Sequence, residues 1–285
     1  MPLFRRPPEH KVNQPAAIGV FDSGVGGLSV LRAIRALLPA QPVIYLADQA
    51  HVPYGSRPLE EVCAFSQEIT RFLLARGAQL IVVACNTASA AALQHLRTLF
   101  PEIPFVGMEP AVKPAAETTR SGRVGVLATP ATFQGALYAS VVERFAAGVR
   151  IYTETCPGLV AEIEAGRQDG PAARRILETA LAPMLAAGID TIVLGCTHYP
   201  YAIPLIQEIS GPHVRVIDPA PAVARQTFRL LDQRGLLAPL PSGPVNPIFF
   251  TSGDPSPLTL LLPTLLGESG PVYPLAWNGP TLSQD

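Results

Sequence analysis

Short runs of β-branched and apolar residues alternate with longer helix-like stretches along most of this 285-residue chain. The pattern predicts strands at Ala17–Phe21, Val43–Ala47, Leu80–Ala84, Val124–Ala128, Val149–Thr153, Ile192–Gly195 and Val214–Ile217. Helical stretches such as Leu28–Leu38 and Leu59–Ala75 lie between them. This alternation is typical of α/β architecture with mostly parallel sheets that are buried on both faces. We therefore expect an α/β fold.

One pattern occurs twice. Leu80–Thr87 (LIVVACNT) and Thr191–His198 (TIVLGCTH) each give an apolar strand, a small residue, a cysteine and polar residues that open a helix. The two copies lie about 110 residues apart, roughly one domain length. This spacing predicts two related α/β domains.

The expected boundaries follow from that repeat. Residues 1–110 form the first domain, residues 111–218 the second, and residues 219–285 return to complete the first. Residues 1–16 are expected to be a loose tail. The segment from about Ala276 onward is expected to be loose as well, because it is rich in Gly, Pro, Ser and Asn.

Composition excludes several classes of protein. A net charge of -1 gives no excess of positive charge for binding nucleic acid. The apolar runs are strand-sized, well short of the roughly 20 residues that span a bilayer. Arg5 and Arg6 are followed by no apolar segment, so they do not form an export signal. Four cysteines without a signal peptide or a C-x-x-C pair predict free thiols in a reducing cytoplasm.

Polar residues follow four of the expected strands. In open α/β sheets, ligands bind at the carboxyl ends of strands, where amides of the next helix are free. The polar strand ends here are Asp22-Ser23, Asp48 with Pro53-Tyr54-Gly55 beyond it, Cys85-Asn86-Thr87 and Cys196-Thr197-His198. Each alone also has a structural explanation. Gly24–Gly27 can be a tight turn that needs positive φ, and its spacing fits neither a P-loop nor a dinucleotide fingerprint. A single cysteine, such as Cys63, is most often a small buried apolar residue.

The pair of cysteines points to specific chemistry. Cys85 and Cys196 each follow a strand at a helix N-terminus, where partial positive charge stabilises a thiolate. A free thiol titrates near pKa 8.5, so modest tuning gives one thiolate and one thiol. Stereoinversion at carbon requires a base on one face and an acid on the other. If both sulfurs face one cleft, they are candidate acid/base catalysts.

The motifs together resemble those of the glutamate racemases of the aspartate/glutamate racemase superfamily. The resemblance covers about Ile18 to Pro255 and rests on five segments: Phe21–Ser29 (FDSGVGGLS), Asp48 with Pro53–Gly55 (PYG), Ala84–Ala88 (ACNTA), Gly195–Pro200 (GCTHYP) and Thr251–Pro255 (TSGDP). It implies two α/β domains with glutamate between them, no pyridoxal phosphate, no metal, and a homodimer. It also implies a cytoplasmic enzyme that supplies D-glutamate for peptidoglycan, and hence for the cell wall and cell shape.

The resemblance assigns roles to particular residues. Cys85 and Cys196 would exchange the α-proton on opposite faces of the substrate. Asp22 would hold the substrate ammonium, orient Cys85, or both, and His198 would donate to a thiolate or a carboxylate. The residues that would contact substrate or tune the thiols are Asp22, Ser23, Tyr54, Gly55, Asn86, Thr87, Thr197 and His198. Among them, Asn86 and Thr87 can donate to a carboxylate, and Tyr54 and Gly55 would bind the side-chain end.

Two segments depart from the family pattern. The family tends to have a Cys-Pro stretch that ends in a glutamate beside the second thiol. Cys156–Glu164 (CPGLVAEIE) matches it, so the resemblance implies that Glu164 lies beside Cys196, but Glu162 stands where the family usually has an apolar residue. The register of this segment is therefore open. In Leu127–Thr132 (LATPAT), Ala131 replaces the usual Gly, and Thr129 and Thr132 are expected to supply hydroxyls to a substrate carboxylate.

Three other functions fit parts of the pattern. An aspartate racemase, or another amino-acid racemase of the superfamily, would differ by about one methylene of pocket length, worth roughly 1–3 kcal/mol. A non-catalytic amino-acid-binding protein would have a similar cleft but no need for matched cysteines. A thiolate metal site built from Cys85, Cys196 and His198 would rest on Cys-x-His, which is a poor spacing signal.

Overall fold

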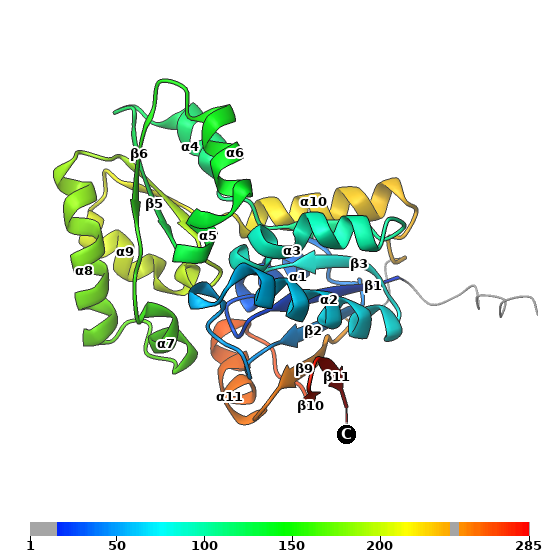
Figure 1. Ribbon diagram of the computed structural model, residues 1–285. Helices are drawn as coiled ribbons and strands as arrows, with labels where there is room; N and C mark the ends of the chain where they lie inside the picture. The colour runs from blue at the N-terminus through cyan, green and yellow to red at the C-terminus, as the bar shows by residue number, and fades with distance from the viewer. Residues whose placement is uncertain (1–15, 240–244, 285) are drawn as a thin grey trace, which may run out of the picture.

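The computed structural model describes residues 16–239 and 245–284 and contains two sheets (Figure 1). The larger sheet has the order β11-β10-β9-β2-β1-β3-β4, and the smaller has the order β6-β5-β7-β8. The strands of the larger sheet are β1 (Ala17–Asp22), β2 (Val43–Ala47), β3 (Ala78–Val83), β4 (Phe105–Gly107), β9 (Ile248–Ser252), β10 (Val272–Asn278) and β11 (Thr281–Ser283). Those of the smaller are β5 (Arg123–Ala128), β6 (Arg150–Glu154), β7 (Thr191–Gly195) and β8 (Arg215–Ile217). Neighbouring strands are parallel except for β10 and β11, so the α/β prediction is confirmed.

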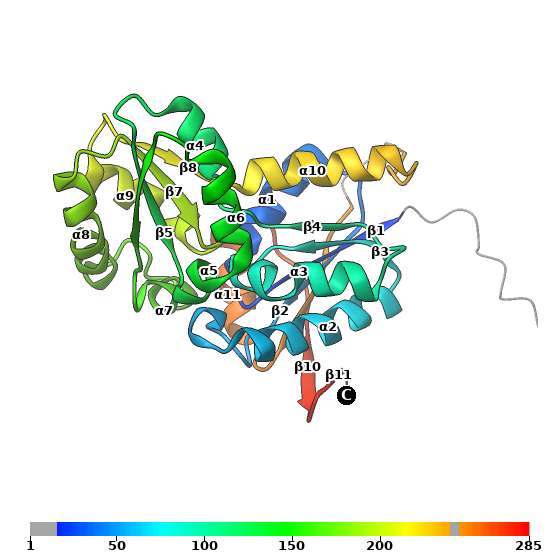
Figure 2. The ribbon, with the colours of Figure 1, turned by 45° about the horizontal axis from the view of Figure 1, so that its top comes forward.

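Helices cover both faces of the larger sheet. On one face lie α1 (Leu28–Leu37), α10 (Ala220–Gln233) and α11 (Ser256–Leu265); on the other lie α2 (Leu59–Ala75) and α3 (Asn86–Leu99) (Figures 1 and 2). Side chains alternate along a strand, so Val20 packs with the first layer and Phe21 with the second. Burial of both faces explains why the central strands are apolar without interruption.

The smaller sheet is built in the same way. One of its faces packs on α4 (Val112–Thr118) and α6 (Ala136–Phe145). The other packs on α8 (Pro171–Ala186) and α9 (Ile203–Ser210). Three short elements complete this part of the chain: α5 (Pro130–Gln134), α7 (Leu159–Glu164) and the 3-10 turn η2 (Tyr199–Ala202). Helix α5 contacts α3 beside the larger sheet, and α7 contacts η2. The larger sheet contributes the 3-10 turn η1 (Tyr54–Ser56) to the same region. The domain limits at residues 110 and 218 remain our proposal.

Two expectations about the chain ends need correction. The segment from Ala276 is not loose, because β10 pairs with β9 and then folds back through Gly279 (φ 61°) into β11. Leu275 and Leu282 are buried in this hairpin, while the polar residues between them hid the strand pattern. At the other end, Ala16 is buried and its carbonyl accepts a hydrogen bond from Gln41. The rest of the expected tail, residues 1–15, lies outside the described residues.

Across residues 16–239 and 245–284, no helix combines the length and the apolar character that a bilayer crossing requires.

Candidate active site

The strand ends singled out in the sequence meet at one cavity between the two sheets. About 270 Å³ of space lies between the atoms around it, and part of that space is open to solvent. Its lining residues come from both sheets: Ser23, Pro53, Tyr54, Gly55, Cys85, Asn86, Thr87, Thr129, Val160, Cys196, Thr197 and His198. The predicted residues Asp22, Thr132 and Glu164 lie directly behind this lining and are hydrogen-bonded to it. A larger cavity around Arg97 and Arg144 contains no thiol, so cavity size does not locate the chemistry here.

Cys85 caps the N-terminus of α3. Its Sγ accepts a hydrogen bond from the amide of Ala88 at 3.4 Å, and the side chain is buried. Burial raises the pKa of the Cys85 thiol, and the negative charge of Asp22 raises it further. The amides of Ala88 and Thr87 oppose that shift without cancelling it. Cys85 is therefore a protonated thiol at neutral pH, able to act as an acid.

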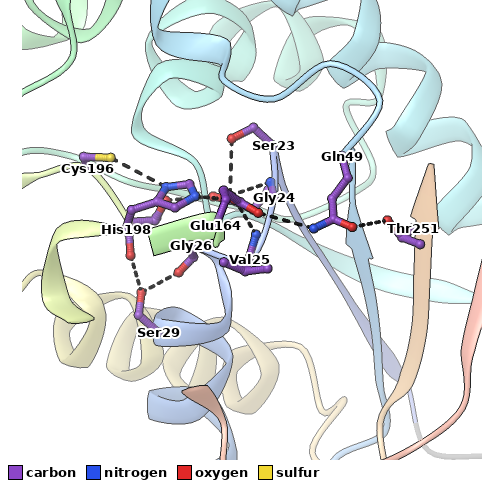
Figure 3. Close-up of polar contacts among 12 residues, drawn as sticks. Ser23, Gly24, Val25, Gly26, Ser29, Gln49, Glu164, Cys196, His198 and Thr251 are labelled. Atoms are coloured by element: carbon purple, nitrogen blue, oxygen red, sulfur yellow. Dashed lines mark hydrogen bonds and ion pairs between the residues drawn. The ribbon is translucent and has the colours of Figure 1, made fainter. Parts of the chain in front are cut away.

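Cys196 follows β7 and is paired with a histidine (Figure 3). Its Sγ lies 3.8 Å from His198 Nδ1, and His198 Nε2 lies 2.6 Å from Glu164 Oε1. Burial lowers the pKa of His198, but the hydrogen bonds to Cys196 and Glu164 and their negative charges outweigh it and raise that pKa well above its usual value. The imidazole is therefore positively charged at neutral pH and can donate to a thiolate at Cys196.

Glu164 belongs to this site and Glu162 does not, which resolves the register of the segment. Glu164 Oε1 also accepts from the amide of Val25 at 2.9 Å, and Oε2 accepts from Gln49 Nε2 at 3.3 Å (Figure 3). Burial raises the pKa of Glu164, but the hydrogen bonds from His198, Val25 and Gln49 lower it overall. Glu162, two residues earlier, instead pairs with Arg167 at 2.8 Å on the surface.

Asp22 links the two halves of the site. It is completely buried, accepts from the amide of Gly24 at 3.0 Å and accepts from Thr197 Oγ1 at 2.9 Å. Burial raises the pKa of Asp22, although His198 and the two hydrogen bonds oppose the rise. Thr197 is bound a second time, since Ser29 Oγ donates to its carbonyl at 3.0 Å.

Three threonine hydroxyls form a second polar cluster. Thr129 Oγ1 lies 2.9 Å from the hydroxyls of both Thr87 and Thr132. Thr129 also caps α5 by accepting from the amide of Thr132 at 3.3 Å. Ala131 fits inside this short helix with ordinary backbone angles, so its replacement of the usual Gly leaves the cluster in place.

The glycines after β1 are needed for close approach rather than for positive φ. The segment does turn from β1 into α1, but none of Gly24, Gly26 and Gly27 has a positive φ, so the expected need for positive φ is wrong. A Cβ on Gly24 would lie 2.0 Å from Glu164 Oε1, and one on Gly26 would lie 2.5 Å from His198 Nδ1. Glu164 on α7 and His198 after β7 therefore pack directly against this backbone.

Asn86 is unusual among the lining residues. Its side chain is 3% exposed, yet neither its amide nitrogen nor its amide oxygen has a hydrogen-bond partner within the described residues. Buried polar groups are normally paired, and leaving one unpaired costs about 1–3 kcal/mol. Such an amide at the wall of a cavity is suited to bind a polar ligand.

Some residues at the site were not expected from the sequence. Val25 contributes only its amide, which leaves no sequence signal, and Gln49 is an ordinary polar residue after a strand. Val160 supplies apolar lining, as does Pro53 of the expected Pro53–Gly55 segment. In the part of the chain that the structure describes, no three His, Cys, Asp or Glu side chains are placed to hold a metal ion, including Cys85, Cys196 and His198.

Comparison with known proteins agrees with this arrangement. The sequence pattern of the family described as Asp/Glu/Hydantoin racemase matches residues 18–227. The chain belongs to this family. It is an isomerase, and its relatives include a glutamate racemase from Pseudomonas aeruginosa strain PAO1, 52% identical over 90% of this chain and 96% of the relative.

Solved racemase structures share the fold. Glutamate racemase from Escherichia coli, in complex with L-glutamate and the activator UDP-MurNAc-Ala, superposes with a TM-score of 0.81 at 33% identity, over 93% of this racemase and 100% of that chain. The enzyme from Francisella tularensis, in complex with D-glutamate, gives 0.79 at 28% identity, over 90% and 96%. Both comparisons cover nearly the whole chain, so the architecture is that of a two-domain α/β racemase.

Proposed function

We propose that this racemase interconverts L- and D-glutamate by moving the α-proton between Cys85 and Cys196, without an organic cofactor or a metal. The observation that carries the proposal is that two free thiols, one from each sheet, line one cavity. Glutamate is favoured as substrate because relatives at about half identity are glutamate racemases and because two homologous structures contain glutamate.

The environments of the two sulfurs suggest their starting states. His198 Nδ1 lies 3.8 Å from Cys196 Sγ and can donate to it, whereas burial keeps Cys85 protonated. The Cys196 thiolate would remove the α-proton from one face, and Cys85 would donate its own proton to the opposite face of the resulting carbanion. The reverse reaction starts from the exchanged protonation states, with Cys85 as base and Cys196 as acid.

The polar lining can hold the α-carboxylate and the ammonium. The unpaired amide of Asn86, the Thr87–Thr129–Thr132 hydroxyls and the free amides at the start of α3 suit the α-carboxylate. Asp22 lies close enough to Cys85 to influence its pKa, so it can neutralise the substrate ammonium beside that thiol and orient the thiol.

The other end of glutamate would lie near η1. Tyr54 and Gly55 line the cavity beside Thr129, and the first amides of a helical turn are free to bind an anion. The side-chain carboxylate would lie there, with Ser23 and Thr197 completing the polar wall.

Removing an α-proton without an electron-sink cofactor requires strong electrostatic support. The negative charge that develops on the substrate would be stabilised by fixed amide and hydroxyl dipoles and by His198, in a cavity from which the two closed halves exclude water. The hydrogen bonds from Thr197 to Asp22 and from Val25 to Glu164 hold the halves together.

The biological setting is part of the same proposal. Relatives from Pseudomonas and Stutzerimonas are glutamate racemases, which supports a cytoplasmic role in supplying D-glutamate for peptidoglycan. A homodimer is part of the same proposal. An aspartate racemase remains the second candidate on chemistry alone, since the mechanism would be unchanged.

Solvent exchange tests the mechanism. In D2O, each glutamate enantiomer should acquire deuterium at Cα as it racemises, with purified enzyme and no added cofactor. Cys85→Ser and Cys196→Ser should each abolish racemisation while circular dichroism shows an unchanged fold. Each variant should still exchange the α-hydrogen of one enantiomer, and the two variants should prefer opposite enantiomers.

Cys63→Ser is the matched control, because Cys63 lies on α2 and does not line the cavity. It should racemise at the wild-type rate. Full activity of either active-site variant, dependence on pyridoxal phosphate, or faster turnover of aspartate than of glutamate would contradict the proposal.

A further inference from the structure

The C-terminal hairpin reaches the active-site region through one side chain. Trp277 lies on β10, is half-buried, and is the sole tryptophan of the chain. Its indole Nε1 donates to Asp48 Oδ1 at 2.8 Å. Its ring also lies against His51 and Phe65, with centroid separations of 5.1 and 5.4 Å.

Asp48 gathers four side chains at the end of β2. Besides Trp277, it accepts from Tyr54 Oη at 2.5 Å and from Ser252 Oγ, and His51 Nδ1 lies 2.9 Å away. A carboxylate has about four acceptor positions, so these contacts use them all. Asp48 is completely buried and does not line the cavity. It is therefore occupied by protein groups rather than available to substrate.

Of these four partners, Tyr54 connects Asp48 to the cavity. Tyr54 is 1% exposed and begins η1, whose backbone we assign to the substrate's side-chain carboxylate. Burial, together with the charge of Asp48 and their hydrogen bond, raises the pKa of Tyr54 well above its usual value. The phenol therefore stays protonated and keeps donating to Asp48, which fixes where η1 lies.

We propose that Trp277 is a positioning residue of the active site, which orients Asp48 and through it Tyr54 and the η1 amides that bind the substrate's side-chain carboxylate. The C-terminal hairpin is then part of the substrate-binding machinery, and not only an edge of the sheet. This inference rests on the proposed function, because it needs a substrate with a second carboxylate at η1.

A double-mutant cycle tests the connection. Trp277→Phe removes the indole N–H but keeps an aromatic ring against His51 and Phe65. We expect the KM for both glutamate enantiomers to rise about three- to ten-fold, with kcat changed less than two-fold, since the hydrogen bond acts on binding rather than on proton transfer. In a Tyr54→Phe background, where the connection is already cut, Trp277→Phe should change KM less than two-fold. The inference would be overturned if the KM increases of the two single variants multiply in the double variant. It would also be overturned if Trp277→Phe alone leaves KM unchanged.

Tyr273→Phe is the matched control, because Tyr273 lies on the same strand, is 41% exposed and packs on Phe250 instead. It should leave KM and kcat unchanged, and a rise equal to that of Trp277→Phe would mean that any change in the hairpin has this effect. If wild-type protein racemises glutamate while Trp277→Phe behaves like wild type, only the positioning role fails. If wild-type protein does not racemise glutamate at all, the proposed function fails first.

Fluorescence gives a second measurement that needs no variant of Trp277. Because Trp277 is the sole tryptophan, glutamate binding at η1 should shift its emission in the wild-type protein. Tyr54→Phe should abolish most of that shift at saturating glutamate. An equal shift in both proteins, or none in the wild type, would contradict a connection through Tyr54.

Discussion

Glu164→Gln is the substitution that tests most directly how the charge state of His198 is maintained. The glutamine keeps an oxygen that can accept from His198 Nε2 and from the amide of Val25, so the geometry is largely preserved. What it removes is the negative charge 2.6 Å from an imidazole that is only 2% exposed. Burial lowers the pKa of His198, and without that charge only the hydrogen bond and charge of Cys196 oppose the effect of burial, so the pKa of His198 should fall.

The expected loss can be bounded from the sulfur–nitrogen distance. A full positive charge 3.8 Å from a thiolate at Cys196 is worth at most about 4 kcal/mol at an effective dielectric constant near 20. Part of this is replaced by a neutral hydrogen bond from the same nitrogen. We therefore expect a loss of about 2–3 kcal/mol, which is roughly a 30- to 150-fold decrease in kcat at neutral pH.

The pH dependence gives a sharper measurement than a single rate. In the wild type, the raised pKa of His198 keeps the ring charged from acidic pH through neutral pH, and activity that depends on it falls only above that raised pKa. In Glu164→Gln, the alkaline limb of the pH–rate profile should move to lower pH by at least about one pH unit, which corresponds to about 1.4 kcal/mol. Initial rates followed by circular dichroism of glutamate, across neutral and mildly alkaline pH, would show the displacement.

The Glu164–His198 ion pair stabilises the folded protein only within a defined range of pH. Glu164 has a lowered pKa, so its contribution is present above about pH 4.5 and is lost as pH falls through the lowered value. His198 has a raised pKa, so its contribution is complete below about pH 6.5 and is lost as pH rises through the raised value. Glu162→Gln is the matched control, because it removes an equal charge from the same helix at a residue bound to Arg167. The role of Glu164 in keeping His198 charged would be refuted if the alkaline limb of the pH–rate profile does not move in Glu164→Gln. An equal decrease of kcat in Glu162→Gln would refute it as well.

Two further substitutions separate binding from stability. Asn86→Ala should raise the KM for glutamate at least ten-fold without lowering the melting temperature, since it removes a buried amide that has no partner in the described protein; a lower melting temperature would show that the amide is structural. Asp190→Asn should cost about 1–2 kcal/mol at pH 7 in urea denaturation and leave kcat unchanged. Burial raises the pKa of Asp190, but hydrogen bonds from Thr119, Ser121 and Arg120 lower it to about 2. The difference between Asp190→Asn and wild type should therefore vanish as pH falls from about 4 to 2, and a constant difference would contradict this account.

Sequence patterns predicted the strands of this protein and the polar residues that directly follow them. All seven predicted strands are present within a few residues of their expected ends. Five of them are apolar runs that are largely buried on both faces, whereas β6 and β8 are partly exposed edge strands. The positions of Cys85 and Cys196 follow from the same rule, because a residue directly after a parallel strand lies at the edge where ligands bind. Strand β4 has only three residues and gave no usable pattern.

What the sequence did not reveal depends on contacts between distant segments. Only the family resemblance placed Glu164 beside Cys196. The residues around Glu164 do not predict its contact with His198, because that pairing requires α7 and the end of β7 to converge. The hydrogen bond from Trp277 to Asp48 joins residues 229 positions apart, and the composition of the C-terminal segment suggested a loose tail. The glycines after β1 were recognised as special, but their reason is the approach of Glu164 and His198, which only the folded chain shows.

Thermodynamics limits how far the different surroundings of the two thiols can make the forward and reverse reactions differ. Two enantiomers of free glutamate have equal free energies, so the equilibrium constant of racemisation is one. The ratio of kcat/KM for the two directions must equal that constant, whatever the protein does to either sulfur. The cation beside Cys196 and the carboxylate beside Cys85 therefore cannot favour one enantiomer in kcat/KM. They can only change how the same free-energy barrier is divided between KM and kcat. A substitution at either sulfur must therefore lower kcat/KM by the same factor for L- and D-glutamate. The two kcat values alone can change by different factors.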